Sequence, residues 1–327
     1  MDRVFAAALL LAAQCLAQTG APEPPLRFGV IGDSGTGGSG QKRVAGQMVK
    51  VNAEKHWEFV LMLGDNIYET GKPTEFDRKF KRIYRPLMDA GVRFHATLGN
   101  HDTIHPDAKK GMVQVNDPAF GYVGSQDEYV FEAGPTQGGR RLARFLTINS
   151  EAWMDAIALG NESELKYRKD RLTAWLDDAA DYRWNVLFLH HPLYSYTQRP
   201  IFGLISRGHG PETELREVLE PLLVGKVDIV LAGHEHFFQK ILPQKGVHYI
   251  VSGGGGKVRK GAVRDPEFVE YAESTLHFLD VSLDSNSFRY RAIDSEGKEI
   301  FTSVISKPAT SGLTENTEQS GSVARTK

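Results

Sequence analysis

Short apolar runs that end in glycine and polar residues alternate with longer amphipathic stretches in the first part of the chain. The runs Leu26–Ile31, Phe59–Leu63 and Val92–Leu98 predict strands, because each is short, apolar and bounded by a turn signal. Between them, the segments from about Gln41 to Lys55 and from Phe76 to Met88 predict helices. Strand, polar loop and helix in this order are typical of an α/β fold, in which functional loops lie at one edge of a sheet.

The same alternation continues further along and then gives way to a β pattern. From Val247 onward, strand-like runs are separated by turns, which favours a second sheet packed on the first. The helices predicted here are Glu164–Ala179 and Leu215–Leu223, and the strands are Trp184–Leu189, Val227–Leu231, Val247–Val251, Thr275–Val281 and Phe288–Ile293.

Both ends of the chain differ from the middle. Arg3 and the apolar run Val4–Leu11, closed by small residues near Ala17, predict a signal peptide over residues 1–17 and therefore a protein exported to the periplasm or secreted. An N-terminal helix and a lipid anchor on Cys15 are the alternatives, while the apolar run is too short for a stable membrane span. A proline-rich linker, 18–25, leads to one catalytic domain, 26–305, and a polar tail, 306–327, is predicted to be disordered.

Composition and charge narrow the function without naming it. The 327 residues carry a net charge of -2, with 41% hydrophobic residues, as expected of an ordinary globular domain. Lys and Arg are mixed with Asp and Glu along the whole chain, so no basic stripe points to nucleic acid. A small phosphorylated substrate is compatible with this balance.

Five predicted strand-end loops carry side chains that can bind metal. Any one of them has an ordinary structural explanation, such as a turn cap or a core hydrogen bond. Together at one sheet edge they predict a metal site, and two carboxylates, a phenol, an amide and three imidazoles suit two ions better than one tetrahedral zinc. A pair of ions clamps a phosphoryl group for in-line displacement. The residues are Asp33; Asp65 with Tyr68; Asn100 with His101; His190; and His234 with His236.

The order of these motifs resembles the calcineurin-like metallophosphoesterase superfamily, and closely its purple acid phosphatase, tartrate-resistant-like branch. Gly35 stands where many relatives have a histidine, and Tyr68 accompanies that change. The resemblance implies two facing mixed β-sheets flanked by helices, an α/β/β/α sandwich with a dinuclear centre at one edge. The motifs are Gly32-Asp33-Ser34-Gly35, Gly64-Asp65-Asn66-Ile67-Tyr68, Gly99-Asn100-His101-Asp102, His190-His191-Pro192 and Gly233-His234-Glu235-His236.

Carried over by position, the resemblance implies a first metal, Fe³⁺, on Asp33, Asp65, Tyr68 and His236, with Asp65 bridging. The second metal, Fe²⁺, Zn²⁺ or Mn²⁺, would be held by Asn100, His190 and His234. The hard anionic phenolate favours a trivalent ion on general grounds. The alignment to Pro192 favours His190 over its neighbour as the ligand, and the role of His191 stays open.

The resemblance further implies hydrolysis of phosphate monoesters with hydroxide on the metals as the nucleophile, that is, an acid phosphatase. His101 and His209 are the candidates for contacting the substrate and protonating the leaving group. For His209 a plain surface loop is the alternative, and Gly253–Gly256 reads as a turn near the metals. The other functions that remain open are phosphodiester hydrolysis and a metal-containing surface protein without turnover.

Overall fold

The computed structural model describes residues 24–107, 114, 117–120, 127–137, 139–197, 209–260 and 267–308. The predicted signal peptide and nearly all of the predicted tail lie outside these residues. The last strand runs to Ser306, and Lys307 still forms an ion pair of 2.5 Å with Asp228. The folded domain therefore extends slightly beyond the predicted boundary at residue 305.

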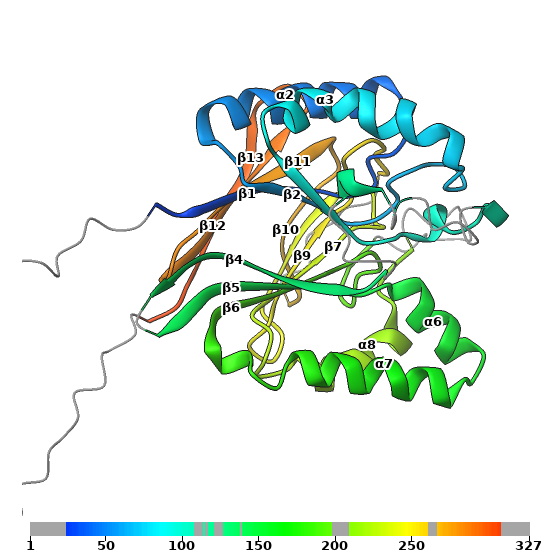
Figure 1. Cartoon of the computed structure of the whole chain (residues 1–327), viewed down its shortest axis with the longest axis vertical. Coiled ribbons are helices and arrows are strands. Elements are labelled where there is room, and N and C mark those ends of the chain that lie inside the picture. Colours follow the sequence, from blue (N-terminus) through cyan, green and yellow to red (C-terminus); the bar gives the residue numbers. More distant parts are fainter. Residues whose placement is uncertain are drawn as a thin grey trace, which may run out of the picture.

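Two mixed sheets face each other, and helices cover the outer face of each (Figure 1). This is the predicted fold class. The first sheet has six strands in the order β13 (Glu299–Ser306), β12 (Ser287–Asp294), β11 (His277–Leu283), β1 (Leu26–Ile31), β2 (Phe59–Met62), β3 (Arg93–Ala96). The second has seven, in the order β10 (Val269–Glu273), β8 (Phe238–Ile241), β9 (His248–Ser252), β7 (Ile229–Ala232), β6 (Tyr182–Leu189), β5 (Arg140–Thr147), β4 (Tyr129–Gln137).

The helices separate into two groups along the chain. Helices α2 (Ser39–Lys55) and α3 (Arg82–Asp89) lie over the first sheet, and α6 (Ser150–Ala158), α7 (Glu162–Trp175) and α8 (Thr213–Leu223) lie over the second (Figure 1). A π-helical turn, η3 (Asp77–Lys81), precedes α3, so the predicted helix Phe76–Met88 is irregular in its first half. Helix α2 buries Val44, Ala45 and Met48 on one face, which is the spacing that packs a helix on a sheet.

The C-terminal strands are arranged differently from the expectation that the strands after Val247 form the second sheet. They do not form the second sheet by themselves: β11 to β13 join the first sheet through the antiparallel pairing of β11 with β1, whereas β9 and β10 belong to the second. The cause is that β1 has one edge free for this pairing, since β2 occupies only its other edge. The first and the last strand of the described residues, β1 and β13, thus lie in the same sheet.

An aromatic core holds the two sheets together. Phe28 of β1 stacks on Phe59 of β2 with ring centroids 5.0 Å apart, and contacts Phe145 of the opposite sheet edge-on at 5.3 Å. All three side chains are fully buried. Burial of side chains of this size is worth about 1.5–3 kcal/mol each, so this layer fixes the spacing between the sheets.

Candidate metal centre

The loops that carry the predicted ligands come from both sheets. Asp33, Asp65 and Asn100 follow β1, β2 and β3, which are adjacent and parallel, so that their carboxyl ends meet. His190 and His234 follow β6 and β7, which are adjacent and parallel in the second sheet. The prediction that one sheet edge gathers all of them is therefore wrong: two facing edges do so, because the parallel units lie in separate sheets.

The first group of donors is Asp33, Tyr68 and His236. The Tyr68 hydroxyl is 3.1 Å from Asp33 Oδ1 and 3.0 Å from His236 Nε2, and the latter two atoms are 3.3 Å apart. Tyr68 is 1% exposed, so its phenol oxygen faces this group and not solvent. The three oxygen and nitrogen atoms converge on one point.

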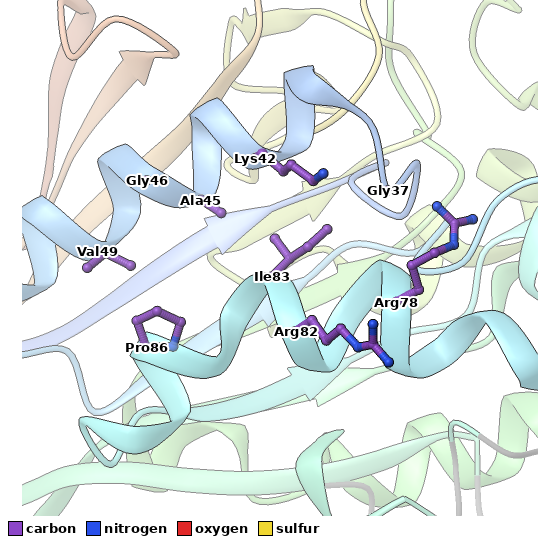
Figure 2. A pocket seen from close by; sticks show the side chains of 9 residues that line it. All are labelled: Gly37, Lys42, Ala45, Gly46, Val49, Arg78, Arg82, Ile83 and Pro86. Atoms are coloured by element: carbon purple, nitrogen blue, oxygen red, sulfur yellow. The ribbon is translucent and has the colours of Figure 1, made fainter.

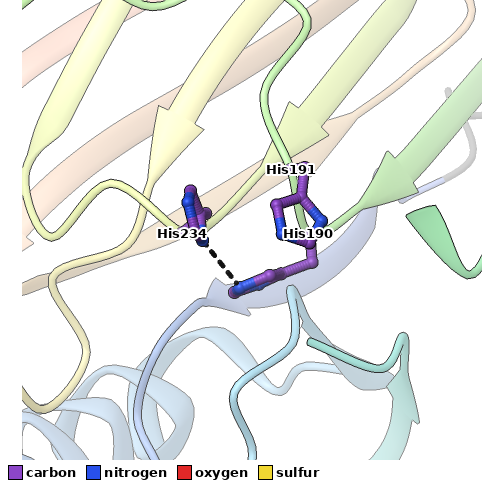
Figure 3. Close-up of side chains that lie close together, drawn as sticks. All are labelled: His190, His191 and His234. Carbon is purple, nitrogen blue, oxygen red and sulfur yellow. Dashed lines mark hydrogen bonds between the residues drawn. The ribbon is translucent and has the colours of Figure 1, made fainter. Parts of the chain in front are cut away.

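The second group contains His190, Asn100 and His234. His190 Nε2 lies 3.1 Å from Asn100 Oδ1 and 3.3 Å from His234 Nδ1, the contact drawn in Figure 3. His190 Nδ1 donates to the carbonyl oxygen of Leu63 at 2.8 Å, which leaves Nε2 free to act as a ligand. The ring is thereby oriented by the strand-end backbone of the facing sheet.

Asp65 lies between the two groups. Its Oδ1 is 3.5 Å from His190 Nε2, and ligand atoms of Asp33, Asp65 and His190 all lie within 4.8 Å of one another. This position supports the bridging role expected of Asp65. The seven predicted metal residues are thus brought together in one buried cluster.

His191 is closer to the cluster than the sequence indicated. Ligand atoms of His190, His191 and His234 lie within 4.8 Å of one another, and Figure 3 shows the three side chains close together. The Oγ of Ser150 is 2.9 Å from His191 Nδ1, and Glu151 Oε2 is 3.6 Å from its Nε2. Burial, and then His190, lower the pKa of His191 well below its ordinary value, so the ring is neutral and can act as a donor.

Three of these ligands have a backbone conformation that L-residues rarely adopt. The φ angles of Asp33, Asp65 and His234 are 56°, 50° and 66°. Each stands directly after a strand and a glycine, where the chain turns sharply. Such strain persists where the surrounding structure enforces it and is concentrated at functional sites.

Gly35 explains how the first two loops approach. A Cβ at this position would lie 2.0 Å from the carbonyl oxygen of Asn66, and the Gly35 carbonyl accepts a hydrogen bond of 2.9 Å from the Tyr68 backbone N–H. The loop that presents Tyr68 therefore occupies the space that a side chain at position 35 would need. The absence of a histidine at 35 and the presence of Tyr68 are linked by this contact.

Two buried carboxylates support the site and were given no role by the sequence analysis. Asp102 accepts hydrogen bonds from the backbone N–H groups of Asn66, Ile67 and Gly99 at 3.0, 2.8 and 2.9 Å, and so joins the second and third loops. Glu235 accepts from the Gly210 N–H at 2.6 Å and so holds the loop that carries His209. Their only sequence signal is that each stands beside a predicted ligand.

The electrostatics of the cluster fit a cation. Burial raises the pKa of Asp33 to about 8, with His190 opposing and Asp65 reinforcing the rise, and burial likewise raises the pKa of Tyr68. Buried anionic oxygens this close together are stable only beside positive charge. His234 presents its Nδ1 to this cluster, 3.3 Å from His190 Nε2, so a second imidazole nitrogen is available there to a metal.

The two predicted substrate histidines lie beside the cluster, where His101 is partly exposed and His209 is exposed. The His101 ring packs against Tyr68 with centroids 4.7 Å apart, and its Nδ1 is 2.5 Å from the Glu69 carbonyl oxygen. The His209 ring is 4.3 Å from that of His234. Burial, and next the neighbouring Arg259, lower the pKa of His209 to about 4, so proton donation by this ring stays a prediction restricted to strongly acid conditions.

A cavity of about 450 Å³ lies elsewhere, between α2 and α3 (Figure 2). Its lining combines the apolar Val49 and Ile83 with the cationic Lys42, Arg78 and Arg82. None of the predicted ligands lines it.

Among the described residues, no helix combines the length and apolar character needed to cross a membrane.

Two facing mixed sheets, with carboxylates, a phenol, an amide and imidazoles gathered at their strand ends, are the arrangement expected of a metal-dependent phosphoesterase. A family model described as calcineurin-like phosphoesterase matches residues 26–238, and the chain belongs to this family. Family membership supports phosphoester hydrolysis at a dinuclear metal centre.

The chain is similar in sequence to purple acid phosphatases. It is 26% identical to purple acid phosphatase 7 of Arabidopsis thaliana, over 86% of either chain. It is 23% identical to tartrate-resistant acid phosphatase type 5 of Sus scrofa, over 89% of this chain and 90% of that one. The resemblance expected from the motifs is confirmed.

Solved structures share the fold. The purple acid phosphatase PPD1 from yellow lupin superimposes with a TM-score of 0.67 at 19% identity, covering 86% of this chain and 53% of that one. GAP50, described as the anchor in the inner membrane complex of Plasmodium, gives a TM-score of 0.72 at 18% identity, covering 87% and 89%. Since the name of the latter describes an anchor, the fold alone does not establish turnover.

Proposed function

We propose that the protein hydrolyses phosphate monoesters under acid conditions, with a ferric ion beside Tyr68 and a divalent iron, zinc or manganese ion beside His190. The observation that carries this proposal is the convergence of the Tyr68 hydroxyl, Asp33 Oδ1 and His236 Nε2 within 3.3 Å of one another. A phenolate beside a carboxylate is a donor set suited to a hard trivalent cation.

The donors divide between the two ions as the motifs imply. Asp33, Tyr68 and His236 would hold the first ion, Asn100, His190 and His234 the second, and Asp65 both. When bound, the ions supply Lewis acidity, which lowers the pKa of an attacking water and offsets charge on the phosphoryl oxygens. The neutral state of two of the three imidazoles supports this, because burial lowers the pKa of His236 to about 4 and that of His234 well below its ordinary value.

Residues of the chain orient and enclose the reaction. The backbone N–H of His101 donates to Asp65 Oδ1 at 3.0 Å, and that of His234 donates to Asp33 Oδ2 at 2.8 Å. These hydrogen bonds orient the two carboxylates. The partly exposed His101 ring, which packs on Tyr68, is placed to contact the leaving-group oxygen. Its Nδ1, held at the Glu69 carbonyl, leaves Nε2 as the atom that would exchange a proton there.

The test combines metal content, a visible spectrum and phosphate release by purified protein. We expect two metal ions per chain including iron, a tyrosinate-to-iron absorption band, and faster release from phenyl phosphate at acid than at neutral pH. The Tyr68→Phe variant should lose the band, whereas Tyr167→Phe, which changes an exposed tyrosine of α7, should keep it.

Other results would revise the proposal in distinct ways. A fully active, colourless protein without iron would contradict the ferric assignment. Faster turnover of diphenyl phosphate than of phenyl phosphate would instead identify a phosphodiesterase, and a metal-loaded protein that releases no phosphate from either would identify a non-catalytic relative.

A further inference from the structure

Two cationic side chains flank the metal cluster from a single segment after β9. Lys257 and Arg259 are separated by Val258, whose side chain is 40% exposed. The backbone N–H of Arg259 donates to the His236 carbonyl oxygen at 2.9 Å, which holds this segment against the cluster.

Lys257 stands on the side of the first donor group. Its Nζ lies 3.6 Å from the centroid of the Tyr68 ring. It also pairs with the Glu69 carboxylate at 3.1 Å, but the Glu69 side chain is 69% exposed and the pair is weakened by solvent. A substrate anion can therefore replace Glu69 at low cost.

Arg259 stands on the side of the second donor group. Its Nη1 donates to His209 Nε2 at 2.5 Å, and the His209 ring contacts that of His234. Among the residues that the structure describes, no carboxylate lies within ion-pair distance of Arg259. A guanidinium that faces an imidazole in place of an acid has most of its hydrogen-bonding capacity unused, although its planar fork matches a carboxylate or phosphate group.

The position of these cations indicates what they recognise. The seven predicted ligands account for the two ions, and neither Lys257 nor Arg259 touches a ligand carboxylate. Both are partly exposed and lie beside the cluster, next to Tyr68 and His209, so they are placed to meet the part of the substrate beyond the transferred phosphate. We infer that Lys257 and Arg259 bind a second anionic group, carried by the leaving group, so that the preferred substrates are monoesters of acidic alcohols or phenols. This inference rests on the proposed monoesterase function.

The experiment compares two esters that differ by one charge, phenyl phosphate and 4-carboxyphenyl phosphate. For each protein, kcat/KM for 4-carboxyphenyl phosphate is divided by kcat/KM for phenyl phosphate. Comparison of this ratio between the wild type and a variant cancels the intrinsic reactivity of the two esters. A charge-assisted contact at a half-exposed site changes binding by about ten-fold. We expect the ratio to fall about ten-fold in Arg259→Ala, less in Arg259→Lys and Lys257→Ala, and not at all in Lys260→Ala, an exposed lysine of the same segment.

Two further measurements separate the possible failures. The preference of the wild type should weaken as salt rises, because half-exposed charges are screened. Titration of the metal-loaded protein with phenylphosphonate and 4-carboxyphenylphosphonate, which are not hydrolysed, should give the same ranking of variants in Kd. If the wild type hydrolyses neither ester, the proposed function fails. If it hydrolyses both and the ratio is the same in Arg259→Ala, recognition of a second anionic group by Lys257 and Arg259 is refuted, while the proposed function stands.

Discussion

Replacing Asp102 by alanine removes the acceptor that joins two loops of the metal cluster. Three buried backbone N–H groups, from Asn66, Ile67 and Gly99, lose their partner. A buried donor without an acceptor costs about 1–3 kcal/mol, and water entering the polar space keeps each near the lower value. We therefore expect the free energy of unfolding to fall by about 3 kcal/mol.

For a domain of this size, that loss lowers Tm by roughly 6–12 °C. Metal binding should suffer as well, by about 10- to 100-fold in affinity, since Asp102 orients the loops that carry Asp65 and Asn100. Thermal unfolding and metal titration measure the two effects. Asp102→Asn keeps one acceptor oxygen and removes a buried charge, so it should lose less.

The matched control is Asp89→Ala, which removes a largely exposed carboxylate at the end of α3 and should change stability by less than about 0.5 kcal/mol. A Tm drop below about 2 °C in Asp102→Ala, with metal content unchanged, would refute the argument that this carboxylate holds the loops together.

Two further predictions concern the first loop and the metal-free state. A Cβ at position 35 would lie 2.0 Å from the Asn66 carbonyl oxygen, so Gly35→Ala should reduce metal content and Tm. A Cβ at Gly46 would have nothing within 4 Å, so Gly46→Ala should stabilise α2 by about 0.5–1 kcal/mol. Equal Tm values for the two variants would contradict this. In the metal-free protein, burial raises the pKa of Asp33 from 3.8 to about 8. As pH rises through that interval, the Asp33 carboxyl loses its proton in the unfolded chain before it does in the folded one. The free energy of unfolding should therefore fall over this interval. Denaturant titration after chelation measures the slope, and a rise over the same interval would refute the assignment.

The sequence was sufficient for the elements that place the ligands. Buried parallel strands such as β1 and β2 are continuous apolar runs, and each ends in a glycine and an aspartate, so both the strand and its loop could be predicted. The residues of the cluster could be named because each follows such a run. Their metal-binding roles remain predictions that the experiments above test.

Other features depend on tertiary contacts and left little trace in the sequence. Strand β5 was not predicted because it begins with two arginines, and its buried Arg144 is tolerated only through hydrogen bonds to Asn185 and Asp178. The division of the C-terminal strands between two sheets also has no local signal. Asp102 was missed for the same reason, since its role depends on three backbone N–H groups, one in its own loop and two in the loop after β2.

The division of the cluster between two sheets has a consequence for how the protein matures. During synthesis, Asp33, Asp65, Tyr68 and Asn100 are complete well before His190, His234 and His236 emerge, and the partners of the last three lie in the other sheet. Contacts that distant in the chain form late in folding. With these seven residues as the proposed ligands, full coordination of a metal ion requires a chain that has already docked its sheets. The proposed enzyme would therefore need metal at the place where the chain completes its folding.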